Sequence, residues 1–379
     1  MKKIVFVCQS TNYLLVDVLN EFSLEYDSVF LLSSNFEVLE RRLNNKVNVV
    51  NIISYNKKSL LTRIWTWVYG TLQIFFILFF KFNKYEIVYA TNPPMSYFCS
   101  LLLRNPFSII VFDIYPDALK NIGLTERNLV YRFWAYLNKI IFKRASAIIT
   151  LSKGMYDKLT QYTNKEKVFI INNWSGFDKF MPIEKNENNF LNDNSLSEKF
   201  IILYSGNMGF THSLETLIYV AETLVNFHDI VFVFIGEGEK KKGLQSMVNE
   251  LKLTNCKFFS WQDSYELSFS LAAADIGVVS INNDTAELSV PSKTYNLLSV
   301  GAPLLCIAPK NSELKLLVKK YNNGLCFEAE NIDLIKDYIL NLKMNKSLQH
   351  EFSVNSIKAS KDFHFSNSKK YLDVIGNIN

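Results

Sequence analysis

Two glycine-containing turns in the second half of the chain have residue types that can bind an anion through the backbone. The turn Gly206-Asn207-Met208-Gly209 follows the apolar run ILYS and precedes a helical pattern that we expect to begin near Thr211 or His212. The turn Gly236-Glu237-Gly238 follows VFVFI. Glycine lets backbone amides approach a phosphate, and the positive end of a following helix favours negative charge. Either turn alone is also explained without a ligand, but two of them after consecutive strands favour a nucleotide crevice.

A lysine at a predicted helix start is a second candidate for phosphate binding. Pro291 and Ser292 can start a helix, which places Lys293 in its first turn. Its ammonium group can then meet a phosphate at the same end. Asn296 lies about one turn further on and is expected to face the same side. The alternative is an ordinary solvated lysine.

Asp113 in FDIYPD follows a predicted strand, and Tyr115 lies two residues further on. A buried carboxylate at the end of a strand can orient or deprotonate a hydroxyl group. We therefore predict a catalytic role for Asp113. For Asp117 we predict only that it caps the helix ALKNIGL.

No metal site is expected from the sequence. The chain has no Asp-x-Asp motif, and its histidines lack the spacing of metal ligands. These histidines are His212, His228, His350 and His364. We expect no cofactor, so the charge of a bound phosphate has to be balanced by Lys293 and backbone amides.

The order of four motifs resembles that of a known enzyme family. The motifs are PSKTYNLLSVGAPLL, LYSGNMGFTHSLETLI, FIGEGEKKKGLQ and FDIYPDALKNIGL. Together they resemble family 4 glycosyltransferases of the GT-B fold, especially bacterial enzymes that build capsule, O-antigen or colanic-acid repeat units, including fucosyl and N-acetylfucosaminyl transferases. The resemblance covers nearly the whole chain. It implies an α/β chain whose two Rossmann-like domains face each other across a cleft.

The resemblance also implies roles for individual residues. The loop from Gly206 to Gly209 matches the start of the donor domain, where backbone amides face the diphosphate of a nucleotide sugar, expected to be a UDP-sugar. Lys293 matches a basic residue that neutralises the leaving diphosphate, and Asn296 matches a position that binds the ribose. Asn92 of TNPP is expected near the acceptor, as are Asp113 and Tyr115. Metal-independent transfer with retention at the anomeric carbon is implied.

The chain departs from the family pattern in two places. Leu288 and Asn296 stand where many members have two glutamates about eight residues apart. An asparagine amide can still bond a ribose hydroxyl, whereas the contact to the donor sugar is left open, with Glu287 or Asp284 as substitutes. In place of the usual glycine pair after the first strand, the chain has Gln9, Ser10, Thr11 and Asn12. Acceptor binding at that loop is therefore also left open.

Two series of strands and helices have to position these residues. Apolar runs such as IVFVC, SVFLLS and EIVYA alternate with helical patterns as far as an Asn-rich stretch from Asn172 to Asn194, which we interpret as a linker. A second series begins with FIILYSG. We predict an N-terminal acceptor-binding domain over residues 1–175 and a C-terminal nucleotide-sugar domain over residues 176–360. A last helix, residues 361–379, is expected to pack back toward the N-terminal domain.

Residues 64–80, IWTWVYGTLQIFFILFF, contain no charge and are flanked by lysines and arginine. This segment is long enough for a short membrane span, an interfacial helix or a buried core helix. A membrane span would put the strands before this segment and the strand EIVYA after it on opposite sides of the bilayer. Because one sheet could not then contain both, we favour the interfacial helix. Residues 128–144 repeat the mixture of aromatic and cationic side chains and are expected to lie on the same membrane surface.

Charge is distributed unevenly along the 379 residues. Residues 1–180 contain 22 Lys and Arg against 13 Asp and Glu, and the remainder contains 19 against 23. A basic and aromatic first half favours an anionic membrane surface, whereas nucleic-acid binding would need a module that is not found. With the family resemblance, this predicts a peripheral protein at the cytoplasmic face of the inner membrane, acting on a polyprenyl-diphosphate-linked saccharide.

The N-terminus and the cysteines agree with a cytoplasmic protein. The apolar stretch after Lys2 and Lys3 is about five residues long, too short for a signal peptide, and is interpreted as a first strand. Five scattered cysteines are expected to be reduced thiols.

Three other functions are compatible with parts of the sequence. A nucleotide-sugar epimerase of GT-B architecture would not need the basic, aromatic first half. A dinucleotide-dependent dehydrogenase would need a spaced glycine fingerprint, which is absent. A non-catalytic relative that only binds a lipid carrier stays open because the glutamate pair is missing.

Overall fold

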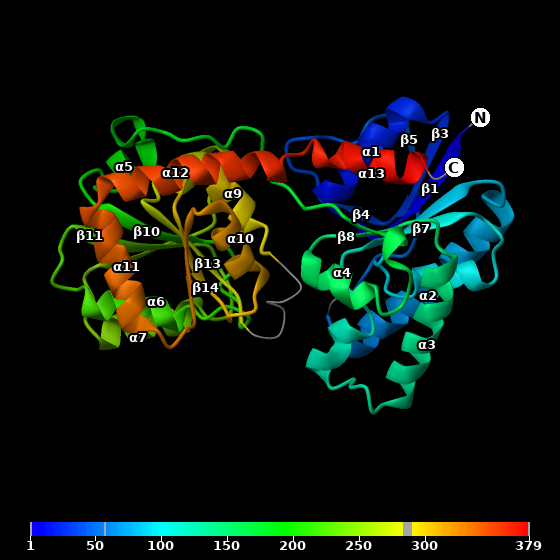
Figure 1. Ribbon diagram of the computed structural model, residues 1–379, viewed down its shortest axis with the longest axis horizontal. Coiled ribbons are helices and arrows are strands. Elements are labelled where there is room, and N and C mark those ends of the chain that lie inside the picture. The colour runs from blue at the N-terminus through cyan, green and yellow to red at the C-terminus, as the bar shows by residue number, and fades with distance from the viewer. Residues whose placement is uncertain (1, 57, 283–289, 378–379) are drawn as a thin grey trace. The chain divides into compact units, whose positions relative to one another are not determined.

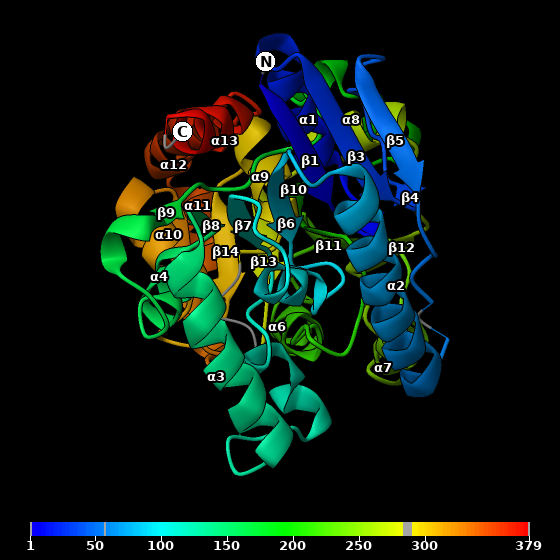
Figure 2. The ribbon, with the colours of Figure 1, turned by 90° about the vertical axis from the view of Figure 1, so that its right-hand side faces the viewer.

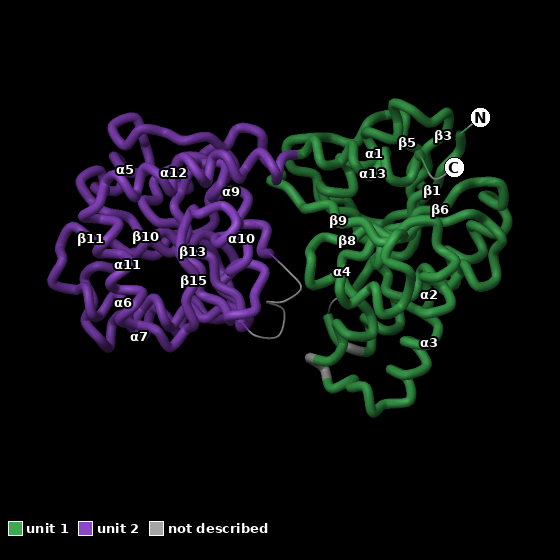
Figure 3. Tube along the Cα trace, viewed as in Figure 1, with its two compact units in different colours: residues 1–176, 365–379 green, residues 177–364 purple. Residues whose placement is uncertain are grey.

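The chain forms two α/β units, each built on its own parallel sheet (Figure 1). The computed structural model describes residues 2–56, 58–282 and 290–377. Unit 1 contains residues 1–176 and 365–379, and unit 2 contains residues 177–364 (Figure 3). The polypeptide therefore passes from one unit to the other twice, after Gly176 and after His364.

Unit 1 contains a parallel sheet of seven strands in the order β5-β3-β1-β6-β7-β8-β9. The strands are β1 (Lys3–Val7), β3 (Ser28–Ser33), β5 (Val47–Asn51), β6 (Glu86–Ala90), β7 (Phe107–Val111), β8 (Ile148–Thr150) and β9 (Val168–Ile170). The short strands β2 (Ser10–Thr11) and β4 (Asn35–Phe36) pair with each other beyond β1 and β3.

The helices of unit 1 lie between these strands in the chain, except for α13, which comes last. They are α1 (Tyr13–Glu25), α2 (Leu60–Lys81), α3 (Leu129–Arg144), α4 (Lys153–Leu159) and α13 (Asn367–Gly376), with 3-10 turns η1 (Ser96–Leu101), η2 (Asp117–Ile122) and η3 (Lys165–Lys167). Asn12 caps α1 by accepting a hydrogen bond from the N–H of Leu15. The two long helices α2 and α3 both contact η1 (Figure 2).

Unit 2 contains a parallel sheet of six strands in the order β12-β11-β10-β13-β14-β15. The strands are β10 (Phe200–Ser205), β11 (Ile230–Ile235), β12 (Cys256–Phe259), β13 (Ile276–Ser280), β14 (Leu304–Ile307) and β15 (Gly324–Phe327). Its helices are α5 (Asn189–Asp193), α6 (Glu215–Thr223), α7 (Lys241–Glu250), α8 (Ser264–Ala272), α9 (Lys293–Ser299), α10 (Glu313–Tyr321), α11 (Ile332–Met344) and α12 (Lys346–Ser360), with η4 (Lys185–Glu187) and η5 (Lys361–Phe363).

Continuous apolar strands explain why both faces of the unit 2 sheet are covered. Every residue of β10 is buried. Ile201 and Leu203 enter the core on one face, and Phe200, Ile202 and Tyr204 enter the core on the other. Because side chains alternate along a strand, a fully apolar strand requires packing on both sides. The α/β architecture with two Rossmann-like units predicted from the sequence is confirmed.

Two local predictions were wrong. The stretch interpreted as a linker, Asn172 to Asn194, contains η4 and α5, and Phe180 and Phe190 are buried in the unit 2 core. The burial of these aromatic residues makes the segment part of unit 2, although its composition is mostly polar. The helix expected near Thr211 or His212 begins only at Glu215. The Ser213 N–H donates to Ser280 Oγ, which holds the preceding residues in a turn.

Helix α2 has one buried stripe and one exposed apolar face. Thr66, Trp67, Ile74 and Leu78 are buried against unit 1. The exposed large apolar residues of this helix are Leu61, Ile64, Trp65, Val68, Tyr69, Leu72, Phe76, Phe79 and Phe80. The alternative of an entirely buried core helix is therefore wrong.

By length and composition, residues 61–81 are the one helix in the described ranges that is able to cross a membrane, with 28% of the apolar window buried. However, α2 connects β5 and β6, which belong to one sheet. A crossing helix would place these two strands on opposite sides of a bilayer, so the fold is incompatible with a membrane span.

Candidate functional site

The two glycine turns of unit 2 lie next to each other because β10 and β11 are neighbouring parallel strands. The Gly206 N–H donates to Ile235 O at 2.9 Å, and the Met208 N–H donates to Glu237 O at 2.8 Å. The Lys240 N–H in turn donates to Met208 O at 2.9 Å. The two loops thus form one hydrogen-bonded structure at the carboxyl ends of the strands.

Glycine is required in both loops by conformation and by space. Gly206, Gly236 and Gly238 have φ values of 147°, 129° and 145°. A Cβ atom on Gly236 would lie 2.2 Å from Gly206 O, and one on Gly238 would lie 2.6 Å from Met208 O. The glycines therefore serve the close packing of one loop on the other.

Only part of the first loop is available to a ligand. The N–H groups of Gly206 and Met208 are used by the second loop, and the Met208 side chain is fully buried in the core. The predicted ligand role of the Met208 amide is therefore wrong. The N–H groups of Asn207 and Gly209 have no hydrogen-bond partner within the described ranges. They are the loop amides that can donate to an anion.

Lys293 lies over this loop. Its Nζ donates to Tyr204 Oη at 2.6 Å, and a Cβ atom added to Gly206 would lie 2.9 Å from Nζ. Burial lowers the pKa of Lys293 to about 7. No carboxylate of the described chain forms an ion pair with it. An ammonium group without a counter-ion in the described chain, over a loop that has two available amides, is suited to an anionic ligand.

His212 contacts the same cluster. Its Nδ1 lies 2.6 Å from Ser280 O, and its ring lies edge-on to Tyr204 with centroids 6.2 Å apart. Burial, followed by the charge of Lys293, lowers the pKa of His212 to about 4, so the ring is neutral near pH 7. Because a carbonyl oxygen only accepts, Nδ1 carries the proton and Nε2 is left as a hydrogen-bond acceptor. The sequence analysis considered the His212 side chain only in excluding a metal site and missed this position.

The other predicted residues of unit 2 contribute differently. Ser292 is exposed directly before α9 and makes no capping hydrogen bond. Asn296 is half-buried one turn after Lys293. Glu237 is exposed and pairs with Lys241 at 2.7 Å, which holds the pKa of its carboxyl below the usual value. The substitutes considered for the glutamate pair, Asp284 and Glu287, lie outside the described residues, as does Leu288.

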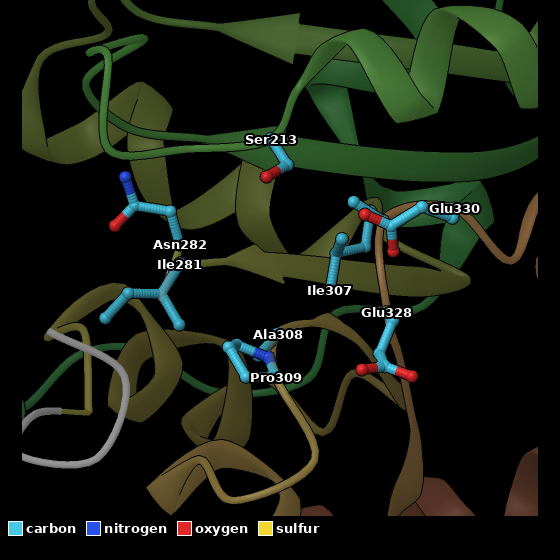
Figure 4. Close-up of a pocket in the computed structure, with 9 residues that line it drawn as sticks. Ser213, Ile281, Asn282, Ile307, Ala308, Pro309, Glu328 and Glu330 are labelled. Carbon is cyan, nitrogen blue, oxygen red and sulfur yellow. The ribbon is translucent and has the colours of Figure 1, made fainter. Parts of the chain in front are cut away.

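A pocket of about 370 Å³ lies at the carboxyl ends of β13, β14 and β15 (Figure 4). Glu328 and Glu330 line one side, and Asn282 lies on the other. Ser213, next to His212, also lines it. Glu328 pairs with Lys310 at 3.0 Å, whereas the Glu330 carboxylate has no partner in the described part of the chain. Such a carboxylate can accept hydrogen bonds from sugar hydroxyls.

Among the residues that the structure describes, none of those predicted from the sequence lines this pocket. The signal that was missed is the place of two pocket glutamates in the chain. Glu328 and Glu330 follow directly after the strand GLCF, and this strand was not recognised.

In unit 1, Asp113 follows β7 and is held by its backbone. Thr91 Oγ1 accepts hydrogen bonds from the N–H groups of Phe112 and Asp113, at 3.0 and 3.2 Å. The carboxylate is accessible, but the surrounding protein desolvates it and raises its pKa. Tyr115 stacks on Trp134 with centroids 5.9 Å apart. Asp113 therefore lies beside an aromatic cluster, which suits a carboxylate that accepts a proton from a hydroxyl.

Two expectations for unit 1 are changed by the structure. Asn92 bonds the neighbouring loop, since its Nδ2 donates to Ser10 O at 3.3 Å and its carbonyl accepts from the Gln9 N–H at 2.6 Å. Asn92 thus positions that loop. Asp117 does not cap a helix by its side chain, because it accepts from Tyr131 Oη and pairs with Lys120 at 3.0 Å. Its predicted capping role is wrong because nearby donors compete for the carboxylate.

The described residues contain no group of three or more His, Cys, Asp or Glu side chains that could hold a metal ion. All five cysteines are free thiols.

Similarity to known proteins places this geometry in context. Residues 186–359 match the family described as Glycosyl transferases group 1. The chain is 24% identical over 282 residues to the "Probable glycosyltransferase WbjE" of Pseudomonas aeruginosa, covering 71% of this chain and 69% of that protein. It is 30% identical over 230 residues to the "Putative colanic acid biosynthesis glycosyl transferase WcaI" of Escherichia coli (strain K12), covering 59% of this chain and 56% of that protein.

The fold is also found in solved structures. Alr3699/HepE of Anabaena, crystallised in complex with UDP and glucose, superposes with a TM-score of 0.71 and 14% identity over 100% of both chains. The GT-B fold predicted from the sequence is confirmed. The matched region and the two relatives show similarity to glycosyltransferases over part of the chain.

Proposed function

We propose that the protein transfers a sugar, with retention at the anomeric carbon, from a nucleoside-diphosphate sugar to a lipid-linked saccharide during surface polysaccharide synthesis. The position of Lys293 carries the proposal. Its ammonium group lies over Gly206, the first residue of the loop that also contains the available amides of Asn207 and Gly209, at the carboxyl ends of parallel strands. Retention rests on the family resemblance, and polysaccharide synthesis on the name of WcaI.

In this proposal the donor diphosphate binds the first glycine loop. Lys293 and the two amides balance the charge that develops on the leaving diphosphate, in place of a metal ion. UDP is the proposed nucleotide because HepE, a protein of the same fold, was crystallised with UDP. Glu330 and the Nε2 of His212 are proposed to accept hydrogen bonds from donor hydroxyls, which would replace the glutamate pair that the chain lacks.

The acceptor is proposed to bind unit 1. Asp113 accepts a hydrogen bond from the attacking hydroxyl and orients it. A raised pKa makes this carboxylate a better proton acceptor than an ordinary aspartate. Tyr115, which is half-buried and stacked on the buried Trp134, is proposed to contact a sugar ring.

Peripheral contact with the cytoplasmic face of the inner membrane is part of the same proposal. The exposed apolar face of α2 provides hydrophobic area. Leu129, Val130, Phe133 and Tyr136 are exposed on α3, where Arg132 and Lys139 are exposed as well. Cations beside apolar side chains suit an anionic lipid surface.

The test is to incubate the protein and bacterial membranes with labelled nucleotide sugars and to measure transfer into lipid. We expect transfer from one donor. We expect Lys293→Ala to lower kcat by about 100-fold, the usual cost of removing one group that stabilises transition-state charge. Lys319→Ala, at an exposed lysine on α10, is the matched control and should leave kcat unchanged.

Other outcomes identify the rival functions. Conversion of the donor sugar without an acceptor would identify an epimerase. Lipid binding without turnover of any donor would identify a non-catalytic protein. Unchanged kinetics in Lys293→Ala would remove the proposed role of that residue.

A further inference from the structure

An arginine near the start of α2 has no counter-ion. The Nε of Arg63 is buried and has no hydrogen-bond partner in the described structure. Its guanidinium group forms no ion pair with any described carboxylate. By contrast, Arg41 of the same unit forms an ion pair with Asp17, with 2.8 Å between Nε and Oδ1. The Asp17 side chain is only 3% exposed. A buried guanidinium N–H without an acceptor is costly, which points to an anionic ligand that accepts its hydrogen bond.

The helix directs Arg63 toward the protein. The buried residues Trp67, Gly70 and Ile74 follow Arg63 at intervals of three or four residues, so all four positions share one face of α2. Leu61, Ile64 and Trp65, which are 80%, 45% and 64% exposed, lie on the other side of the same turns. The guanidinium group therefore lies at the boundary between the exposed apolar face of α2 and the interior of unit 1.

Aromatic residues connect Arg63 to Asp113. Tyr55 stacks on Trp67 at 5.9 Å, and Trp67 meets Tyr115 edge-on at 6.1 Å. Burial raises the pKa of Tyr115, Asp113 raises it further, and Arg63 opposes this shift. The pKa of Tyr55 responds to both charges in the same way. One aromatic cluster thus has a cation and a carboxylate at its edges.

We propose that Arg63 binds the diphosphate of the lipid-linked acceptor, between the membrane-facing side of α2 and Asp113. This inference rests on the proposed function, since it assigns the acceptor's anionic part to the same site. A planar guanidinium can donate two parallel hydrogen bonds to one phosphate, and this geometry fits a phosphate better than it fits a neutral sugar. The lipid tail would lie along Leu61, Ile64 and Trp65, and the sugar would reach Asp113.

The proposal is tested by binding, without sugar transfer. Farnesyl diphosphate and farnesol are titrated into the full-length protein in detergent micelles. We expect the diphosphate to bind at least about tenfold more tightly than the alcohol, as for charge-assisted hydrogen bonds to a buried group. Arg63→Gln should remove that preference and leave farnesol binding unchanged.

Two variants serve as controls. Lys81→Gln removes a cation from the other end of the same helix, where Lys81 is exposed, and should keep the preference. Arg63→Lys keeps the charge but loses the paired hydrogen bonds, so an intermediate preference is expected. An unchanged denaturant unfolding transition of unit 1, to which α2 belongs, shows that each variant is folded.

Two results would overturn the proposal. One is equal binding of the diphosphate and the alcohol by the unmodified protein, and the other is a full preference retained by Arg63→Gln. Failure of the proposed function is a separate observation, namely no sugar transfer from any labelled donor. Transfer that is unaffected by Arg63→Gln would leave the transferase function standing and remove only the role of Arg63.

Discussion

The acid–base equilibrium of Lys293 links the donor site to pH. Burial lowers its pKa to about 7, and the hydroxyl of Tyr204 is its hydrogen-bond partner. Below pH 7 the free protein holds mainly the ammonium form, and above it mainly the neutral amine. A bound diphosphate favours the ammonium form and raises this pKa. When the pH is above the pKa that Lys293 has in the free protein, donor binding is therefore accompanied by uptake of a proton.

We predict that the affinity for UDP falls as the pH rises through about 7, by up to about tenfold per pH unit. Calorimetry from about pH 6.5 to about pH 9, in buffers of different ionisation enthalpy, measures both the affinity and the proton uptake. Lys293→Met should bind UDP more weakly and without proton uptake, and Lys319→Met should behave as the unmodified protein. The same pH dependence in Lys293→Met would show that another group titrates.

At the level of residues, part of the site could be predicted from where residues lie at the ends of strands and helices. Gly206 ends a strand and Lys293 begins a helix, and these ends meet in a parallel α/β unit. The roles of Tyr204 and His212 depend on contacts that no local pattern reports. The partner of His212 is the carbonyl of Ser280, 68 residues away. The occupied amides of Gly206 and Met208 also depend on packing of the second glycine loop.

At the level of elements, α2 differs from an ordinary amphipathic helix because its outward face is apolar as well. The Ser59 capping box starts the helix, and its buried stripe holds it on unit 1. The exposed face has no cover within the described chain. Transfer of that face into a lipid interface would remove apolar area from water, which is favourable by about 25 cal/mol per Å².

We predict that Leu72→Glu weakens binding to anionic vesicles by about tenfold or more. The substitution removes a leucine that would be buried in the lipid, and it adds a negative charge that the anionic lipid repels. Vesicle flotation measures the bound fraction. Leu316→Glu is the matched control, because Leu316 of α10 and Leu72 are each 53% exposed. Equal flotation of the two variants would place the membrane contact elsewhere. Both should change the free energy of unfolding by less than about 1 kcal/mol, as exposed sites do.

The elements that were predicted correctly have strong local patterns. Continuous apolar runs predicted β10, β11 and β14, because strands buried on both faces tolerate few polar residues. The strand β15 was missed because it begins with glycine and, as an edge strand, has no continuous run of buried apolar residues. Composition predicted that α2 is a helix but not which face is covered, since both faces are apolar. That decision comes from the tertiary contacts of Trp67 and Gly70.

At the level of the whole molecule, each unit has a core of its own, but the chain order does not follow the units. Helix α13 comes after all of unit 2 and is nevertheless part of unit 1. Tyr371 and Ile375 of α13 are buried in the core that contains Leu15 and Phe22 of α1. The ring of Tyr371 also meets Trp174 edge-on at 6.2 Å. Unit 1 is therefore completed only by the last residues described.

This arrangement predicts which unit a C-terminal substitution destabilises. Tyr371→Ala removes a buried aromatic ring from unit 1 and should lower its free energy of unfolding by about 3–5 kcal/mol. Denaturant titration of variants that keep a single tryptophan can follow each unit by fluorescence, because Trp174 lies beside Tyr371 in unit 1 and Trp261 belongs to unit 2. Leu342→Ala, a fully buried control in α11, should instead shift the transition of unit 2. If Tyr371→Ala shifts both transitions equally, the units unfold as one cooperative structure, and stability at the acceptor side cannot be changed without changing the donor side.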